Sequence, residues 1–321
     1  TTPLNLIRSP SGLLRSEEEL LLEPFDYIER LPGKAIRPRL IAAFNEWLKV
    51  PQNIIDSVSS ITQKLHNASL MIDDIEDNSK LRRGKPVAHL VYGIPQTLNT
   101  ANYVYFQALK DVHNLGNPRA VEVFITEMLE LHRGQGLDIY WRDNSICPTE
   151  EEYIHMVTCK TGGLFRLSVS IMQCFSECEL DFLAMVNDLG LYFQVLDDYL
   201  NLQSEAYHTN KSYCEDLTEG KYSFLLVHSI SRAKDAVLAN ILKQRTTDHD
   251  MKRYALERME ESGSFEYTRD FLRKVRARLD EHIARLPENR LVQALLKDLY
   301  APLDSPSELS GGAASSQAAK S

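Results

Sequence analysis

Residues 70–78 have the sequence LMIDDIEDN, and this stretch decides how the rest of the chain is interpreted. Asp73 and Asp77 are four positions apart, so on a helix they lie on one face. Two bare carboxylates in that geometry repel each other by about a few tenths of a kcal/mol on an exposed helix, and apolar neighbours raise the cost. A divalent cation would convert this repulsion into shared coordination. For this segment alone, an acidic helix end that faces solvent is an equally open interpretation.

A second polar stripe occurs much later in the chain, in residues 194–201. Gln194, Asp197, Asp198 and Asn201 have the spacing i, i+3, i+4, i+7, which predicts that all four project from one helical face. Their neighbours are mostly apolar, so the helix is expected to be buried, and a buried polar stripe needs partners. A satisfied polar network would meet that need. We favour a metal site, because this stripe can face the first across a cavity, and oxygen ligands alone select a hard cation such as magnesium.

Basic residues accompany both acidic segments. They are Lys34, Arg37, Lys80, Arg82, Arg83, Lys160, Lys211 and Lys221. Arginine forks and lysine point charges are how proteins hold phosphates, although each residue taken singly is more simply a surface charge. Gly162 and Gly163 follow Lys160-Thr161, and two glycines inside a helical pattern could let the backbone open near a ligand. Together the residues describe a cavity with two carboxylate walls and a basic rim, which suits a metal-bound diphosphate.

The composition favours a single all-helical domain. Glycine (14) and proline (13) are few for 321 residues, which favours long helices. Residues 1–20 are expected to be an irregular N-terminal segment, with a capping-box pattern at Ser16 and Glu19 that begins the first helix. Residues 21–302 are expected to form the domain. The Ser/Gly/Ala-rich residues 303–321 are expected to be a disordered tail.

Charge and cysteine content exclude several classes of protein. The net charge of -9 argues against general nucleic-acid binding, which needs a strongly basic surface. No run of about 18 apolar residues is present, so no membrane-spanning helix is expected. The five cysteines contain no CxxC pair and are expected to be free thiols in a reducing compartment. We therefore expect a cytoplasmic protein.

The order and spacing of several short motifs, over about residues 21–300, resemble the trans-type short-chain isoprenyl diphosphate synthases. The resemblance is strongest to the animal-type geranylgeranyl diphosphate synthases. The motifs are LPGK at 31–34 with Arg37, HNAS at 66–69, DDIED at 73–77, KLRRG at 80–84, GQGLD at 134–138, KTGG at 160–163, Gln194 with Asp197-Asp198, and EDLTEGK at 215–221. Each string alone is weak, and their combination is specific.

The resemblance implies an all-α isoprenoid synthase bundle around a deep central cavity. Asp73, Asp77 and Asp197 would ligate about three magnesium ions, and Asn201 departs from the general DDxxD pattern and is not expected to be a ligand. The allylic diphosphate would be surrounded by Arg82, Lys160, Thr161, Gln194, Lys211 and Lys221. The isopentenyl diphosphate would be bound by Lys34, Arg37, His66 and Arg83. The residues expected to be catalytic are Asp73, Asp77, Arg82, Lys160, Asp197 and Lys221.

The resemblance also implies residues that set product length. Ala68 and Ser69 lie about one helical turn before Asp73 and are small, so a growing tail could pass them. Tyr105, Phe106 and His132 would form a lower floor. The alternative for Ala68 and Ser69 is that small residues simply allow two helices to pack.

The activity implied is the condensation of isopentenyl diphosphate with an allylic diphosphate, mainly farnesyl diphosphate, to geranylgeranyl diphosphate, by a homodimer or higher homo-oligomer. Two alternatives are a terpene synthase on the same scaffold and an inactive regulatory subunit of a prenyltransferase. A terpene synthase would not need the isopentenyl set, and an inactive subunit would be expected to lack an acidic motif.

Overall fold

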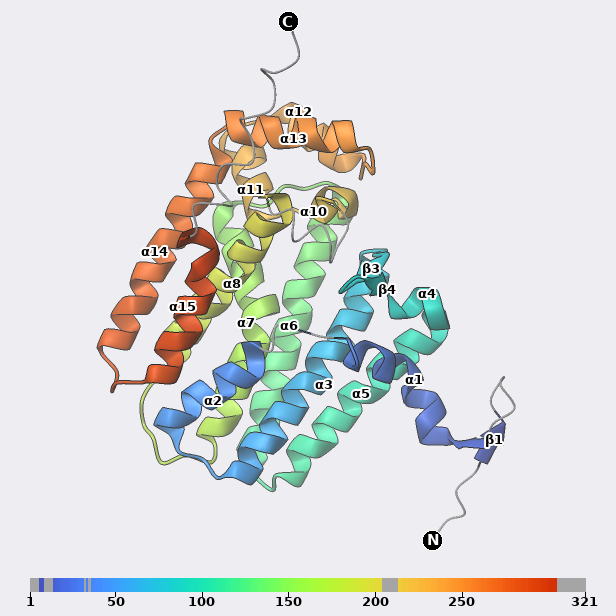
Figure 1. The fold of residues 1–321 in the computed structure, drawn as a ribbon, viewed down its shortest axis with the longest axis vertical. Coiled ribbons are helices and arrows are strands. Elements are labelled where there is room, and N and C mark those ends of the chain that lie inside the picture. The colour runs from blue at the N-terminus through green and yellow to red at the C-terminus, as the bar shows by residue number, and fades with distance from the viewer. Residues whose placement is uncertain (1–5, 9–13, 32, 34–35, 204–212, 305–321) are drawn as a thin grey trace, which may run out of the picture.

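The computed structural model describes residues 6–8, 14–31, 33, 36–203 and 213–304, and helices make up most of them (Figure 1). The all-α fold expected from the sequence is confirmed. The helices are α1 (Glu17–Glu29), α2 (Ile36–Leu48), α3 (Gln52–Glu76), α4 (Ala88–Tyr92), α5 (Ile94–Asn114), α6 (Pro118–Asn144), α7 (Glu150–Gln173), α8 (Leu183–Gln203), α10 (Glu215–Glu219), α11 (Phe224–Val227), the π-helix η1 (His228–Arg232), α12 (Ala236–Lys243), α13 (His249–Glu261), α14 (Ser264–Ala284) and α15 (Arg290–Asp304). None of the described helices is long and apolar enough to cross a membrane.

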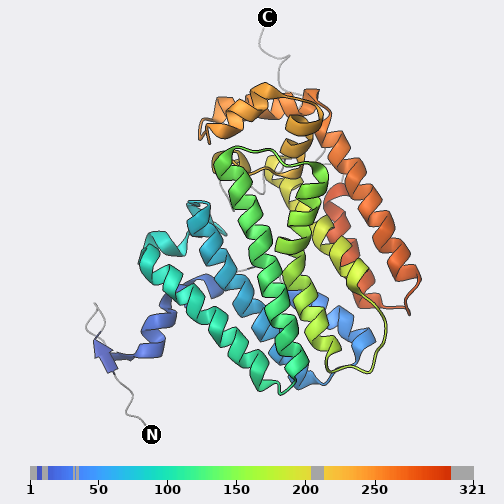
Figure 2. The ribbon, with the colours of Figure 1, turned by 180° about the vertical axis from the view of Figure 1, so that it is seen from behind.

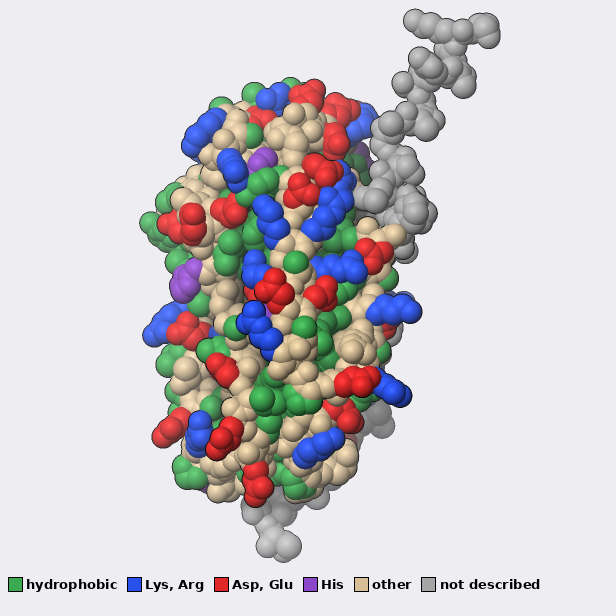
Figure 3. Space-filling model, turned by 90° about the vertical axis from the view of Figure 1, so that its left-hand side faces the viewer, with side chains coloured by type: hydrophobic (Ala, Val, Ile, Leu, Met, Phe, Trp, Pro, Cys, Tyr) green, Lys and Arg blue, Asp and Glu red, His purple; other side chains and the backbone are tan. Residues whose placement is uncertain are grey.

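The long helices α3, α6, α7 and α8 form the centre of the bundle (Figures 1 and 2). Helix α6 packs along α7, and α7 along α8, while α5 covers α3 and α14 covers α8. Helices α12 and α13 lie across one end, and α15 packs against α2 (Figure 1). The face that carries α14 and α15 shows charges of both signs side by side (Figure 3), including an ion pair between Arg278 and Asp188 at 2.6 Å.

Glycines allow α6, α7 and α8 to approach one another closely. A Cβ on Gly134 of α6 would lie 2.5 Å from the Lys160 nitrogen of α7, and one on Gly190 of α8 would lie 3.0 Å from the Gly162 Cα. Helix α7 is continuous from Glu150 to Gln173. The expectation that Gly162 and Gly163 open the backbone is therefore wrong, because at least Gly162 serves close helix packing instead.

Two short antiparallel strand pairs add to the helices. β1 (Leu6–Arg8) pairs with β2 (Leu14–Ser16), and β3 (Leu81–Arg82) pairs with β4 (Lys85–Pro86). The first pair lies in the segment expected to be irregular, and three-residue strands are too short to show a sequence period. Helix α1 begins directly after β2 with the capping box of Ser16 and Glu19. The expected tail falls mainly on residues 305–321, which lie outside the described residues.

Candidate active site

The first acidic segment forms the C-terminal end of α3. Asp73 is half-buried, and burial raises the pKa of its carboxyl to about 7 although the charge of Lys160 opposes the rise. Asp77 is the C-cap residue, and its backbone N–H donates to the Asp73 carbonyl at 2.8 Å. Asp74 is completely buried. One helical turn therefore holds three aspartates in different surroundings.

Arg82 on β3 turns back toward the helix that precedes it. Its Nε donates to Asp74 Oδ1 at 3.0 Å, and its Nη2 donates to the same oxygen. Burial alone would lower the pKa of Arg82, but the charge of Asp74 raises it overall. Arg82 is thus a permanently charged group held in place by the second aspartate of the motif.

Three of the four residues assigned to isopentenyl diphosphate interact with one another. Burial and the nearby charge of Arg83 lower the pKa of Arg37 to about 10, and its buried Nε has no hydrogen-bond partner among the described residues. Burial, then Arg37 and Arg83, hold the pKa of His66 well below its usual range, so the ring is neutral at pH 7. Arg83 donates to the Leu31 carbonyl at 2.7 Å. The fourth residue, Lys34, lies outside the described residues.

Lys160 and Thr161 on α7 face different partners. Lys160 Nζ donates to Asp138 Oδ2 of α6 at 2.8 Å. Burial opposes a rise in the pKa of Lys160, but Asp138 and the carboxylates at the end of α3 raise it overall. The Thr161 hydroxyl donates to Gln194 Oε1 of α8 at 2.6 Å. Lys211, assigned to the same diphosphate, lies outside the described residues.

Asp198 in the second acidic segment is held entirely by the protein. It is 1% exposed, and its Oδ2 accepts from the Tyr153 hydroxyl and, at 2.8 Å, from the Phe224 backbone N–H. Its Oδ1 accepts from Gln194 Nε2 at 2.8 Å and lies 3.5 Å from Lys221 Nζ. These contacts are the satisfied polar network that the sequence left open as an alternative.

The four polar residues of α8 do not all face one region. Asn201 is 3% exposed, and its Oδ1 accepts from the Asp216 backbone N–H at 3.3 Å. Asp197 is half-buried and lines a pocket instead. The expectation that all four residues share one metal-facing side is therefore wrong for Asp198 and Asn201, because contacts with distant parts of the chain bury both side chains. Asn201 was already not expected to be a ligand.

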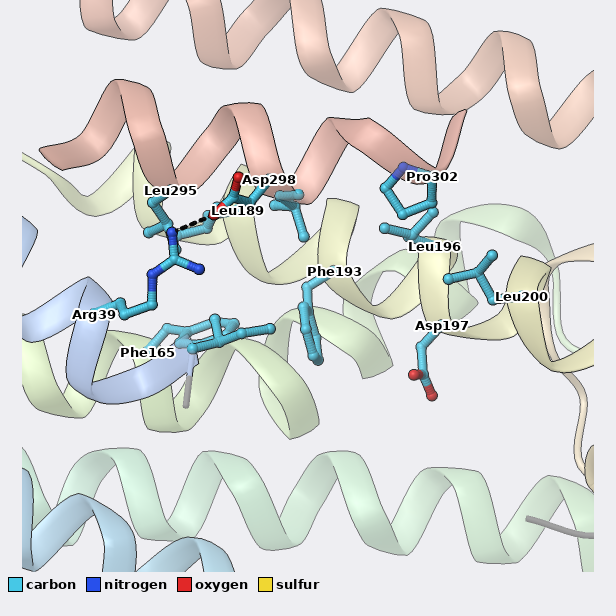
Figure 4. A pocket seen from close by; sticks show the side chains of 12 residues that line it. Arg39, Phe165, Leu189, Phe193, Leu196, Asp197, Leu200, Leu295, Asp298 and Pro302 are labelled. Carbon is cyan, nitrogen blue, oxygen red and sulfur yellow. Dashed lines mark hydrogen bonds and ion pairs between the residues drawn. The ribbon is translucent and has the colours of Figure 1, made fainter. Parts of the chain in front are cut away.

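The pocket that Asp197 lines has a volume of about 260 Å³ and lies between α2, α7, α8 and α15 (Figure 4). The rings of Phe165 and Phe193 line its middle, and Asp197 marks one end. At the other end, Arg39 forms an ion pair of 2.6 Å with Asp298. The pocket surrounds Asp197 with mainly apolar groups.

The residues assigned to product length divide into inner and outer groups. Tyr105 of α5 is half-buried and contacts the ring of His132 of α6 edge to face, with ring centroids 5.8 Å apart, but His132 itself is exposed. Phe106 is 71% exposed, so within this chain it does not form an inner floor, because the next position on a helix points away. Ala68 is 0% exposed in an apolar cluster, whereas Ser69 is half-buried.

Three residues of α6 for which no role was expected contact the first acidic segment or its neighbour Lys160. Gln135 Nε2 donates to Glu76 Oε2 at 2.6 Å, and Arg142 Nη1 donates to Asp77 Oδ1. Asp138, the partner of Lys160, lies between them. Their spacing of i, i+3 and i+7 puts all three on one helical face, and that periodicity was a usable signal in the sequence.

The donors fit a hard divalent cation. Asp73, Asp77 and Asp197 offer only carboxylate oxygens, and a cation beside Asp73 would stabilise the charged form that its partial burial disfavours. Within the described ranges, no three histidine, cysteine or acidic side chains converge into a complete metal cage. Magnesium is usually held by one or two carboxylates together with substrate phosphates and water, so a divided set of ligands suits it.

Comparisons with known proteins cover nearly the whole described chain. The Polyprenyl synthetase family model matches residues 18–259, which include both acidic segments. A geranylgeranyl pyrophosphate synthase of Mucor circinelloides f. lusitanicus is 51% identical over 286 residues, covering 89% of this chain and 94% of that protein. A geranylgeranyl pyrophosphate synthase of Metarhizium anisopliae is 54% identical over 261 residues, covering 81% and 79%. A protein of Matsumurasca onukii named terpene synthase is 52% identical over 283 residues, covering 88% and 93%.

Proposed function

This chain belongs to the polyprenyl synthetase family, and we propose that it condenses isopentenyl diphosphate with an allylic diphosphate, mainly farnesyl diphosphate, to give geranylgeranyl diphosphate. The observation that supports the proposal is two groups of side chains suited to bind diphosphates. One comprises the cations beside the acidic segments, and the other comprises Arg37, His66 and Arg83. Two relatives named as geranylgeranyl pyrophosphate synthases span most of the chain.

The first site would hold the allylic diphosphate. Asp73, Asp77 and Asp197 would hold magnesium, which when bound stabilises the charge that develops on the departing pyrophosphate. Lys160 and Lys221 are half-buried cations whose pKa values neighbouring carboxylates raise against the opposing effect of burial, so both remain charged. Both would face the same pyrophosphate. Lys160 is oriented by Asp138, which fixes where its charge acts.

The second site would hold isopentenyl diphosphate next to the reacting carbon. The allylic carbon–oxygen bond breaks, the double bond of isopentenyl diphosphate attacks the resulting cation, and a proton then passes to the released pyrophosphate. Holding both substrates together makes the attack effectively intramolecular. The unpartnered Nε of Arg37 is a donor suited to the second diphosphate, and neutral His66 can add a hydrogen bond without adding charge.

A terpene synthase is the alternative that a specific observation favours, because the Matsumurasca onukii relative carries that name. Such an enzyme ionises one diphosphate and has no use for a second anion site. The inactive-subunit alternative is disfavoured because both acidic segments are present with their charged partners.

The deciding experiment combines purified protein, magnesium, isopentenyl diphosphate and each allylic primer, with products separated by chain length. We expect a twenty-carbon diphosphate from farnesyl diphosphate only when isopentenyl diphosphate is present. An Arg83→Met variant should raise KM for isopentenyl diphosphate more than KM for the primer. A hydrocarbon formed without isopentenyl diphosphate would identify a terpene synthase, and no product from any primer would support the inactive subunit.

The assembly proposed with this function is a homodimer or higher homo-oligomer. Helices α5 and α6 lie side by side (Figure 2) and expose large apolar side chains, including Phe106 at 71%, Leu129 at 56% and Ile125 at 48%. Exposed apolar surface of this kind marks protein–protein contacts. Sedimentation velocity should show an oligomer that Phe106→Ser with Leu129→Ser dissociates, and a monomeric wild-type protein would contradict this assignment.

A further inference from the structure

Arg142, near the C-terminal end of α6, hydrogen-bonds to the C-terminal end of α3. Its side chain is 8% exposed. Its Nη1 donates to Asp77 Oδ1, its Nη2 donates to the Glu76 carbonyl at 3.0 Å, and its Nε donates to Asp143 Oδ1 at 3.1 Å. One guanidinium therefore joins the side chain of Asp77 to the backbone of the residue before it.

The position of Asp77 makes this contact important. The end of a helix leaves carbonyl groups without partners inside the helix, and it is the negative end of the helix dipole. Asp77 is the C-cap residue of α3, so no further helical turn packs around its side chain. The planar fork of Arg142 binds the Glu76 carbonyl and Asp77 Oδ1 together, which fixes the orientation of the carboxylate relative to the helix.

Arg142 is itself held from the opposite side of the site. Asp143 Oδ1 also accepts from Arg245 Nη2 at 2.8 Å. The side chain of Arg245 packs over Gly220, where an added Cβ would lie 3.1 Å from Arg245 Cγ, and Gly220 directly precedes Lys221. Arg142 thus contacts the first acidic segment directly. Through Asp143 and Arg245 it is also connected to the turn that precedes Lys221.

We propose that Arg142 is the positioning residue of the metal ligand Asp77, fixing one of its carboxylate oxygens so that the other is directed to the cation. The inference rests on the proposed function, since it takes Asp77 as a magnesium ligand. Groups that hydrogen-bond to metal ligands typically contribute about 10- to 100-fold to metal affinity or activity. Arg142 acts through Asp77 and does not itself contact substrate.

The test measures magnesium dependence in two ways. Arg142→Met should raise the magnesium concentration for half-maximal activity by about tenfold or more, with kcat largely recovered at saturating magnesium. Titration calorimetry of magnesium into the protein with inorganic pyrophosphate should show the same weakening without turnover. Arg142→Lys should recover only part of the loss, because a lysine keeps the charge but cannot form the fork.

Arg133→Met is the matched control, because Arg133 is on the same helix, is 66% exposed and pairs with Glu130 within that helix. Its magnesium dependence should equal that of the wild type. An unchanged magnesium requirement in Arg142→Met would overturn the inference, and so would a lowered one, which would show that Arg142 competes with the cation. A wild-type protein without magnesium-dependent prenyl transfer would instead overturn the proposed function.

If Arg142→Met does not fold, Asp143→Asn decides the question. That variant removes the charge of the acceptor that orients Arg142 Nε, so it loosens the guanidinium without deleting it. A smaller increase in the magnesium requirement would support the positioning role, and an unchanged requirement in a protein of wild-type melting temperature would overturn it.

Discussion

The two acidic segments share a pair of adjacent aspartates, and in each pair the second member is buried while the first is half-buried. Asp198 is bound by Gln194 of its own helix and by Tyr153 and Phe224 of two others, so both of its oxygens have partners within the protein. Asp74 Oδ1 is bound by Arg82, while its buried Oδ2 has no hydrogen-bond partner among the described residues. Asp73 and Asp197 lie next to them and remain partly accessible. In each pair the buried aspartate, Asp74 or Asp198, binds neighbouring groups of the protein. We propose that the half-buried one, Asp73 or Asp197, binds the cation.

The segments differ at the position four residues beyond the first aspartate. In the first segment this is Asp77, just past the end of α3, where Arg142 from another helix reaches it. In the second it is Asn201, inside α8 and 3% exposed, where it accepts a backbone N–H. A charged ligand is tolerated where a helix ends near other charged groups, and a neutral amide suits the same spacing inside the core.

Removing the metal tests what the two segments have in common, and it should have the largest effect. If Asp73, Asp77 and Asp197 hold the same ions, EDTA should abolish prenyl transfer, because the charge on the leaving pyrophosphate would no longer be stabilised. Added magnesium should restore activity in a continuous pyrophosphate-release assay. Full turnover in EDTA would show that the two acidic segments do not hold a catalytic metal ion.

Asp198→Ala should cause the largest loss of stability. It removes one of the two carboxylates beside half-buried Lys221 and leaves the Tyr153 hydroxyl and the Phe224 N–H without their acceptor. Leaving a buried donor without an acceptor costs about 1–3 kcal/mol, and this variant leaves two. Urea unfolding measures this loss, and the exposed Asp250→Ala is the control, expected to change stability by less than about 0.5 kcal/mol. Equal stabilities would show that Asp198 does not organise the core.

Asp77→Ala should act on catalysis more than on stability. It removes a proposed metal ligand from the site where charge would develop, and losing one such contribution costs about 10²–10³ in kcat. Steady-state kinetics at saturating magnesium should show the loss, and the free energy of unfolding should fall less than in Asp198→Ala. Near-normal kcat would remove Asp77 from the metal site and leave the first segment with a single ligand.

Ser69 and Ala68 test whether α3 also shapes the product. Ala68 is fully buried in an apolar cluster, so Ala68→Phe should overpack it and cost about 1–3 kcal/mol without shortening the product. Ser69 is half-buried, so Ser69→Phe should instead shift the product from twenty to fifteen carbons, while the geranyl-primed addition continues. Chromatography of the products together with melting temperatures separates the two results. A shortened product from Ala68→Phe would reverse this assignment.

The sequence predicted the all-α fold from its few glycines and prolines and from the resemblance of its motifs. It also predicted that both acidic segments are helical, because helical spacing is local. It did not predict which way Asp198 and Asn201 face, because that depends on Tyr153 and Asp216, which are distant in the chain. For the same reason it assigned no role to Arg142. The two glycines of α7 were misread because a glycine that opens a helix and one that admits a neighbouring helix look alike in sequence.

Asn201→Ala should have the smallest effect, and it addresses the comparison most directly. The variant removes the acceptor of the buried Asp216 N–H, and leaving such a donor without a partner costs about 1–3 kcal/mol of stability. Asp216 Oδ1 lies 3.8 Å from Lys221 Nζ, so a shift of Asp216 would slightly displace the lysine. We therefore expect a small fall in kcat, well below the fall in Asp77→Ala. The magnesium concentration for half-maximal activity should not change, since an amide buried in the core holds no ion. An Asn201→Ala variant that needs more magnesium, or that loses as much kcat as Asp77→Ala, would contradict this. Asn201 would then act on the metal as Asp77 is proposed to do.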